Sequence, residues 1–67
     1  MNKPTTGAEL LLLQIENEMA PTETALLAGQ ASDLAEYKRM CGYLQGLERA
    51  SQLVKDLAKQ MENDDDE

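Results

Sequence analysis

The sequence lacks histidine, the side chain most often used in general acid–base catalysis. Its 67 residues include one cysteine, Cys41. General acid–base chemistry would depend on carboxylates, lysines, tyrosines or this thiol, and each needs a cleft or a neighbouring charge to shift its pKa into a useful range. The sequence predicts helical surfaces without such a cleft. We interpret Cys41 as a small residue at the edge of a helix seam, and we expect no catalytic residues.

Metal and cofactor sites are not predicted either. Residues 63–67 carry four carboxylates, but they lack the glycine turn and the spaced oxygen ligands of a calcium-binding loop. Without histidine, a zinc site would need unusual ligands, and no glycine-rich phosphate loop is present. We therefore expect no metal, no cofactor and no small-molecule substrate.

The charge distribution argues against direct binding of nucleic acid. The net charge is −7, from six basic and thirteen acidic residues. Affinity for phosphate backbones comes mainly from clustered Lys and Arg, and the nearest approach to a cluster is the isolated pair Lys38 and Arg39.

The chain also lacks the sequence features of a membrane or secreted protein. Its longest apolar run, residues 10–15, is interrupted by Gln14 and flanked by Glu9 and Glu16. A lone cysteine fits a reducing compartment. We expect no contact with a membrane and a location in the cytoplasm.

Residues 33–62 have the spacing of one long amphipathic helix. Apolar and small side chains recur at alternating intervals of three and four, as in the a/d seam of a heptad repeat. The members of this seam are Tyr37, Met40, Leu44, Leu47, Ser51, Val54, Ala58 and Met61. Because such a seam needs to be buried, the pattern predicts a helix that packs against a partner.

The N-terminal half predicts two shorter helices. Thr6 and Glu9 form a capping box, so a first helix should cover residues 7–20. Pro21 disfavours helical geometry in the residue before it, and should end that helix and open a short one at residues 22–28.

The sequence after residue 28 predicts the end of the short helix, the start of the long helix and an acidic tail. Gly29 should end the short helix in a left-handed conformation, and Asp33 followed by Glu36 should start the long helix. Beyond residue 62, the carboxylates repel one another and oppose the negative end of the helix dipole. We expect a single all-α domain at residues 1–62, shaped as a helical hairpin, and a disordered acidic tail at residues 63–67.

Two glycines interrupt the long helix. Each costs a helix interior roughly 1 kcal/mol relative to alanine. Gly42, Gly46 and Ala50 are spaced four apart, which suggests that a second backbone approaches closely along this row.

A chain of this size has too small a core to be comfortably stable alone. It buries only about 60% of the surface that its unfolded form exposes, and no internal disulfide is available. The consecutive leucines at 10–13 point around a full turn, so one partner helix covers only part of them. We expect self-association or docking on a larger protein through Leu11, Leu12, Ile15, Tyr37, Met40, Gly42, Tyr43, Leu44, Gly46, Leu47, Ala50, Val54, Leu57 and Met61.

Residues 37–50 also resemble a known group of proteins. Their sequence is YKRMCGYLQGLERA, with a tyrosine, two glycines four apart, a leucine after the second glycine and an alanine three residues later. With the helical continuation and acidic end, about half of the chain is similar to small uncharacterised helical proteins encoded among the head and portal genes of tailed bacteriophages. The resemblance implies a small virion or virion-assembly component, without catalytic residues.

Three functional hypotheses follow. The first is a helical protein that forms homo-oligomers or docks on a larger structural protein in a phage particle or its assembly pathway. The alternative is a small acidic inhibitor that blocks a basic nucleic-acid-binding surface of a host enzyme, as the net charge suggests. A third is a coiled-coil dimer that serves as a spacer and leaves the N-terminal helix unpacked. Added salt distinguishes the first two hypotheses. Binding through charge mimicry weakens steeply with ionic strength, whereas apolar assembly does not.

Overall fold

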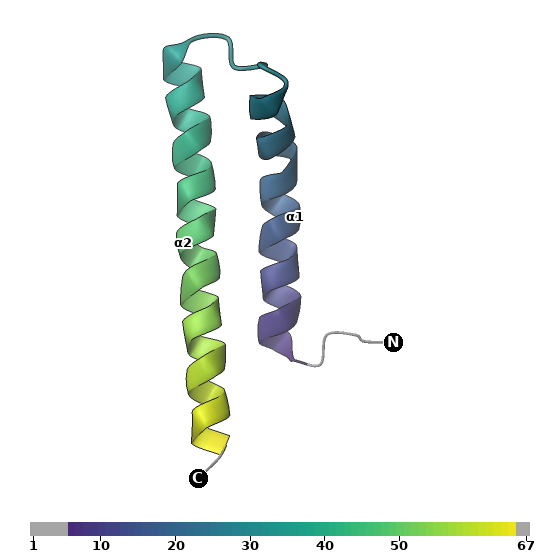
Figure 1. Cartoon of the computed structure of the whole chain (residues 1–67), viewed down its shortest axis with the longest axis vertical. Coiled ribbons are helices and arrows are strands. Elements are labelled where there is room, and N and C mark those ends of the chain that lie inside the picture. Colours follow the sequence, from purple (N-terminus) through teal and green to yellow (C-terminus); the bar gives the residue numbers. More distant parts are fainter. Residues whose placement is uncertain (1–5, 66–67) are drawn as a thin grey trace.

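The protein is a hairpin of two antiparallel helices joined by a short loop (Figure 1). The computed structural model describes residues 6–65, and the side chains of residues 6–62. Helix α1 spans Gly7–Leu27 and helix α2 spans Leu34–Asp65. No strand occurs in the described part of the chain. The predicted all-α hairpin is therefore confirmed.

Side-chain caps fix where both helices begin. The Thr6 hydroxyl accepts a hydrogen bond from the backbone N–H of Glu9 at 3.1 Å, and Oδ1 of Asp33 accepts one from the N–H of Glu36 at 2.8 Å. Each satisfies a helix N–H that has no backbone partner, which stabilises a helix by about 1 kcal/mol. Both predicted helix starts are confirmed.

The end of α1 is set by Gly29, whose φ of +71° lies in the left-handed region. Its N–H donates to the carbonyl of Leu26, and the N–H of Gln30 donates to the carbonyl of Ala25, both at 3.0 Å. These two bonds form a Schellman motif, which turns the chain sharply out of the helix. Glycine adopts this backbone conformation without a steric penalty, so the predicted left-handed cap is confirmed.

The predicted break at Pro21 is wrong. Helix α1 continues through this proline, so the two helices expected at residues 7–20 and 22–28 are one. Proline removes the N–H that would bond the carbonyl of Asn17. Both residues are exposed, so water can satisfy that carbonyl, while Met19 and Thr22 on either side are half-buried. A break would separate these two packed positions.

The long helix ends later than predicted. Helix α2 reaches Asp65, three residues beyond the expected end near residue 62. Repulsion between exposed carboxylates within a helix amounts to a few tenths of a kcal/mol, which is too little to unwind the last turn. The prediction of a disordered tail is thus wrong for the backbone of residues 63–65. Residues 66 and 67 lie outside the described part.

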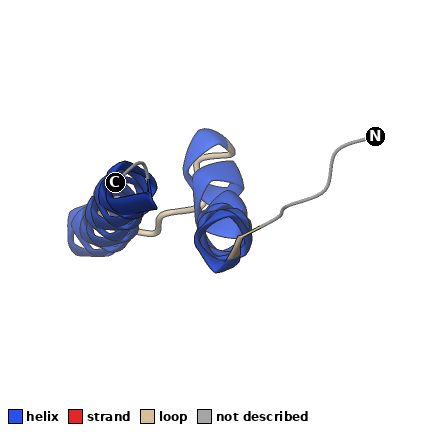
Figure 2. Cartoon of the chain, turned by 90° about the horizontal axis from the view of Figure 1, so that it is seen from below, coloured by secondary structure: helices blue, strands red, loops and turns tan. Residues whose placement is uncertain are grey.

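The two helices pack in a single layer (Figure 2). The Cα trace measures 52 × 25 × 12 Å, the flat shape of two helices that lie side by side. Positions covered by the facing helix recur at intervals of four and three, and we call them the inner rows. The inner row of α1 is Ala8, Leu12, Ile15, Met19, Thr22 and Leu26, and that of α2 is Met40, Leu44, Leu47, Ser51, Val54 and Ala58.

The inner rows confirm most of the predicted seam and show its limits. Tyr37 and Met61, at its two ends, are exposed. Among the described residues, Ile15 alone is buried, with 8% of its surface accessible, and the other members of the inner rows are half-buried. One helix covers one side of its partner, so a single layer cannot enclose more.

Replacing Pro21 with Ala should stabilise the hairpin. The substitution restores one helical hydrogen bond at an exposed position, so we expect the free energy of unfolding to rise by about 1 to 3 kcal/mol. Urea unfolding followed by circular dichroism measures the change. Thr24→Ala, also exposed in α1, is the control and should shift stability by less than about 0.5 kcal/mol. No gain from Pro21→Ala would contradict this account of the helix.

Candidate interaction surface

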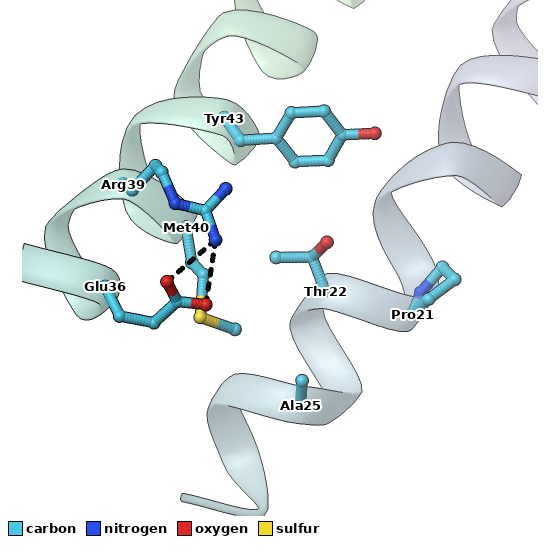
Figure 3. Close-up of a pocket in the computed structure, with 7 residues that line it drawn as sticks. All are labelled: Pro21, Thr22, Ala25, Glu36, Arg39, Met40 and Tyr43. Atoms are coloured by element: carbon cyan, nitrogen blue, oxygen red, sulfur yellow. Dashed lines mark hydrogen bonds and ion pairs between the residues drawn. The ribbon is translucent and has the colours of Figure 1, made fainter. Parts of the chain in front are cut away.

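The loop end of the hairpin carries a shallow cleft of about 340 Å³ (Figure 3). Both helices line it, through Pro21, Thr22 and Ala25 of α1 and Glu36, Arg39, Met40 and Tyr43 of α2. A guanidinium nitrogen of Arg39 donates to both carboxylate oxygens of Glu36 at 2.8 Å. This contact holds the pKa of Arg39 above its ordinary value. The one cation of the cleft is therefore already neutralised, which makes the cleft a poor anion site.

Cys41 lies one turn after Tyr37 on α2 and is half-buried. Hydrogen bonding with this thiol raises the pKa of the Tyr37 phenol above its ordinary value of 10.0, and charge repulsion from the thiolate adds to the shift. A phenol that keeps its proton does not activate a thiol as a nucleophile. The contact fits the predicted structural role of Cys41.

The described residues hold neither a cluster of metal ligands nor a helix that could span a membrane. No group of three or more acidic or cysteine side chains is placed to hold a metal ion within residues 6–65. Neither α1 nor α2, over their described lengths, is long and apolar enough to cross a membrane.

The open end of the hairpin carries a larger, mostly apolar groove of about 410 Å³. Its apolar lining comes from Ala8 and Leu11 of α1 and from Val54, Leu57, Ala58 and Met61 of α2. Thr6, Gly7, Glu9 and Glu62 complete the lining. Leu57 is 54% exposed although it lines the same groove as residues of α1. The groove is thus a place where the hairpin leaves apolar surface in contact with water.

Leu57 of this groove is also part of a second row of small and apolar residues on α2. We call it the outer row, and its members are Tyr43, Gly46, Ala50, Leu53 and Leu57. Each directly precedes a member of the inner row, so it has the same alternating spacing of three and four. Successive residues of an α-helix are rotated by 100°. The outer row therefore faces about 100° away from α1.

Contacts across the hairpin show which side of the molecule the outer row occupies. The Tyr43 hydroxyl donates to Oε1 of Glu18 at a long 3.4 Å. Ala25 lines the loop-end cleft together with Tyr43, and Leu11 lines the open-end groove together with Leu57. These residues share one side of the hairpin. We define the broad face as the outer row of α2 with Leu11, Glu18 and Ala25 of α1.

Charged side chains of α2 avoid the open-end half of this broad face. Between residues 46 and 61 the helix carries five charged residues, and none belongs to the inner or the outer row. They are Glu48, Arg49, Lys55, Asp56 and Lys59. The α2 part of the broad face around Ala50, Leu53 and Leu57 therefore carries no charged side chain, and the nearest charges of the groove are Glu9 and Glu62 at its open end.

The glycines do not mark the crossing of α1 and α2. Apart from the adjoining backbone of α2, a Cβ atom added at Gly42 or Gly46 would meet no atom within 4 Å. The predicted close approach of a second backbone is therefore not made within the hairpin. Gly46 lies in the outer row, whereas Gly42 lies in neither row. Of the two, only Gly46 is placed where another molecule on the broad face would meet it.

The predicted interface residues divide into two groups. Ile15 is buried, and Leu12, Met40, Leu44, Leu47, Ala50 and Val54 are half-buried. The exposed members are Leu11, Tyr37, Gly42, Tyr43, Gly46, Leu57 and Met61. Leu53, 53% exposed in the middle of the outer row, was not among the predicted residues, although its spacing from Ala50 and Leu57 places it in the same row.

The Cys41→Ala substitution should lower the pKa of Tyr37 toward 10.0. The raised pKa means that the neutral phenol is favoured in the fold, so this contribution to stability is present below pH 10 and is lost as the pH rises through the raised value. Absorbance titration in a Tyr43→Phe background, with and without Cys41→Ala, measures the shift on one tyrosine. Identical titration curves would show that the thiol does not contact Tyr37.

Comparison with protein-family models, curated proteins and solved structures found no match to this chain.

Proposed function

We propose that this chain is a non-enzymatic helical assembly protein, which oligomerises or docks on a larger structural protein. The observation that carries the proposal is the apolar surface left open by the hairpin. Ten large apolar side chains are exposed among the described residues: Leu10, Leu11, Leu13, Leu27, Leu34, Tyr37, Tyr43, Leu53, Leu57 and Met61. Contiguous exposed apolar surface in a small protein is typical of a binding site.

The total accessible surface supports the same interpretation. The chain exposes 5524 Å², whereas a compact monomer of its 7.4 kDa mass would expose about 4,200 Å². The excess of about 1,300 Å² is larger than the roughly 800 Å² that each partner buries in a standard protein interface. Docking of this surface would give the chain the burial that a domain of this mass normally has.

The resemblance of residues 37–50 to proteins of phage head and portal gene modules suggests the setting. A small helical component that docks on a larger structural protein fits a virion or its assembly pathway. Association would proceed by packing a helical apolar face into a complementary face, one of the recurring modes of helix recognition.

A second candidate is the acidic inhibitor, and one feature of α1 favours it. Helix α1 carries four glutamates and no lysine or arginine. Three of them, Glu9, Glu16 and Glu23, recur every seven residues along one side of the helix. Such a line would suit a basic partner surface, whose binding would depend on salt. The spacer hypothesis is less favoured, because it requires an unpacked N-terminal helix and α1 contacts α2.

The stability of the full chain should depend on its concentration. Since folding and association bury the same apolar surface, the midpoint of thermal unfolding should rise over a roughly hundredfold range of concentration. The rise should persist at high salt. Circular dichroism melts and light scattering measure both. A sharp melt with a constant midpoint and a monomer mass would contradict the assembly proposal.

A further inference from the structure

We infer that the broad face of the hairpin is the surface on which a second copy of this chain packs, giving a dimeric four-helix bundle. The inference deepens the proposed function and rests on it, because it names both the partner and the surface. Its centre is the apolar half of the broad face, around Ala50, Leu53 and Leu57.

The angle between the two rows of α2 matches a four-helix bundle. In such a bundle each helix packs against two neighbours, which lie about 90° apart around its axis. The inner row of α2 faces α1, and the outer row is rotated by about 100° from it. A helix with one neighbour buries only one row of this spacing. The outer row therefore indicates a second helical neighbour.

Helix α1 extends this surface across the hairpin. Leu11 lies in the same groove as Leu57, so both helices contribute to the apolar half. At the loop end, Tyr43 and Glu18 form the polar edge of the broad face. A central apolar region with a polar rim is the usual anatomy of a stable interface.

The size of the excess surface is sufficient for a second copy of the chain. Two hairpins that each bury about 800 Å² form an interface of standard size, and each would still be within the roughly 1,300 Å² by which this chain exceeds a compact monomer. The α2 part of the apolar half, around Ala50, Leu53 and Leu57, carries no charged side chain, so two like surfaces can meet there without repulsion. Glu9 and Glu62 lie in the groove at its open-end edge. Isologous packing of one patch on itself is also the commonest way in which proteins form dimers.

The other exposed apolar row is a weaker candidate. Leu10, Leu13 and Leu27 lie on α1 away from α2, at a spacing that also includes Asn17 and Thr24. These two polar residues interrupt the row, and it is confined to a single helix. The broad face is apolar over a continuous half and draws on both helices.

A matched pair of lysine substitutions tests the surface. Leu53→Lys places a charge in the apolar half, whereas Gln52→Lys adds the same charge one residue away, at an exposed position outside both rows. In sedimentation equilibrium of the full chain, Leu53→Lys should raise the dimer dissociation constant by at least about 30-fold. Gln52→Lys should change it by less than about 3-fold.

The two glycines of α2 give a second pair that does not risk unfolding. Gly42→Leu and Gly46→Leu both raise helix propensity, and, apart from the adjoining backbone of α2, neither position has an atom of the hairpin within 4 Å of an added Cβ. Helicity of the dilute monomer should therefore rise equally in both variants. Only Gly46→Leu should weaken the dimer, by about 10-fold or more, because its side chain projects into the neighbouring copy.

Three results would overturn the inference. Equal dissociation constants for Leu53→Lys and Gln52→Lys would place the dimer on another surface, and loss of the dimer in Leu13→Lys instead would assign it to the outer row of α1. Both of these leave the proposed function standing. A wild-type chain that stays monomeric would exclude a second copy as the occupant. If that monomer also melted sharply and independently of concentration, the proposed function would fail with it.

Discussion

The structure depends on one constraint, which is that two helices in a single layer share only one contact surface. Each inner-row residue is covered from one side by the facing helix and stays open on the other. For this reason Ile15 is the one buried residue among those described, although the inner rows contain six positions on each helix. Interhelical packing normally stabilises a fold through fully enclosed side chains, each worth roughly 1.5 to 3 kcal/mol. The side chains of the hairpin are only partly enclosed, so they supply only part of this stabilisation. Further burial could come from a partner that covers the apolar groove at the open end.

The ends of the helices were predictable because their signals are local. Thr6, Asp33 and Gly29 act on backbone groups no more than four residues away, so their sequence context contains the whole interaction. Pro21 is the instructive failure. Its cost to the helix is local, but the advantage of continuing through it comes from half-buried residues on both sides that pack against α2. That advantage depends on tertiary structure, which sequence patterns around the proline do not contain.

The proposed interaction surface was predictable in its residue types but not in its orientation. The heptad spacing of α2 identified the inner row, including Leu44, Leu47 and Val54, because periodicity fixes which residues share one side of a helix. Periodicity does not say which of two adjacent rows faces the other helix. The glycines were therefore grouped with Ala50 as one close-packed row. In the structure Gly46 and Ala50 belong to the outer row and Gly42 does not, and Leu53 completes that row.

The central claim is that the apolar side chains of α2 need a surface beyond α1 to become fully protected from water. Amide hydrogen exchange of the full chain at low and high protein concentration, under the same pH and temperature, tests it directly. We predict that the backbone amides of residues 46–58 exchange rapidly in dilute solution and become protected by at least about 30-fold as concentration rises, since exchange then requires dissociation. Strong protection of these amides that is the same at both concentrations would show that the hairpin is complete by itself and would contradict the account.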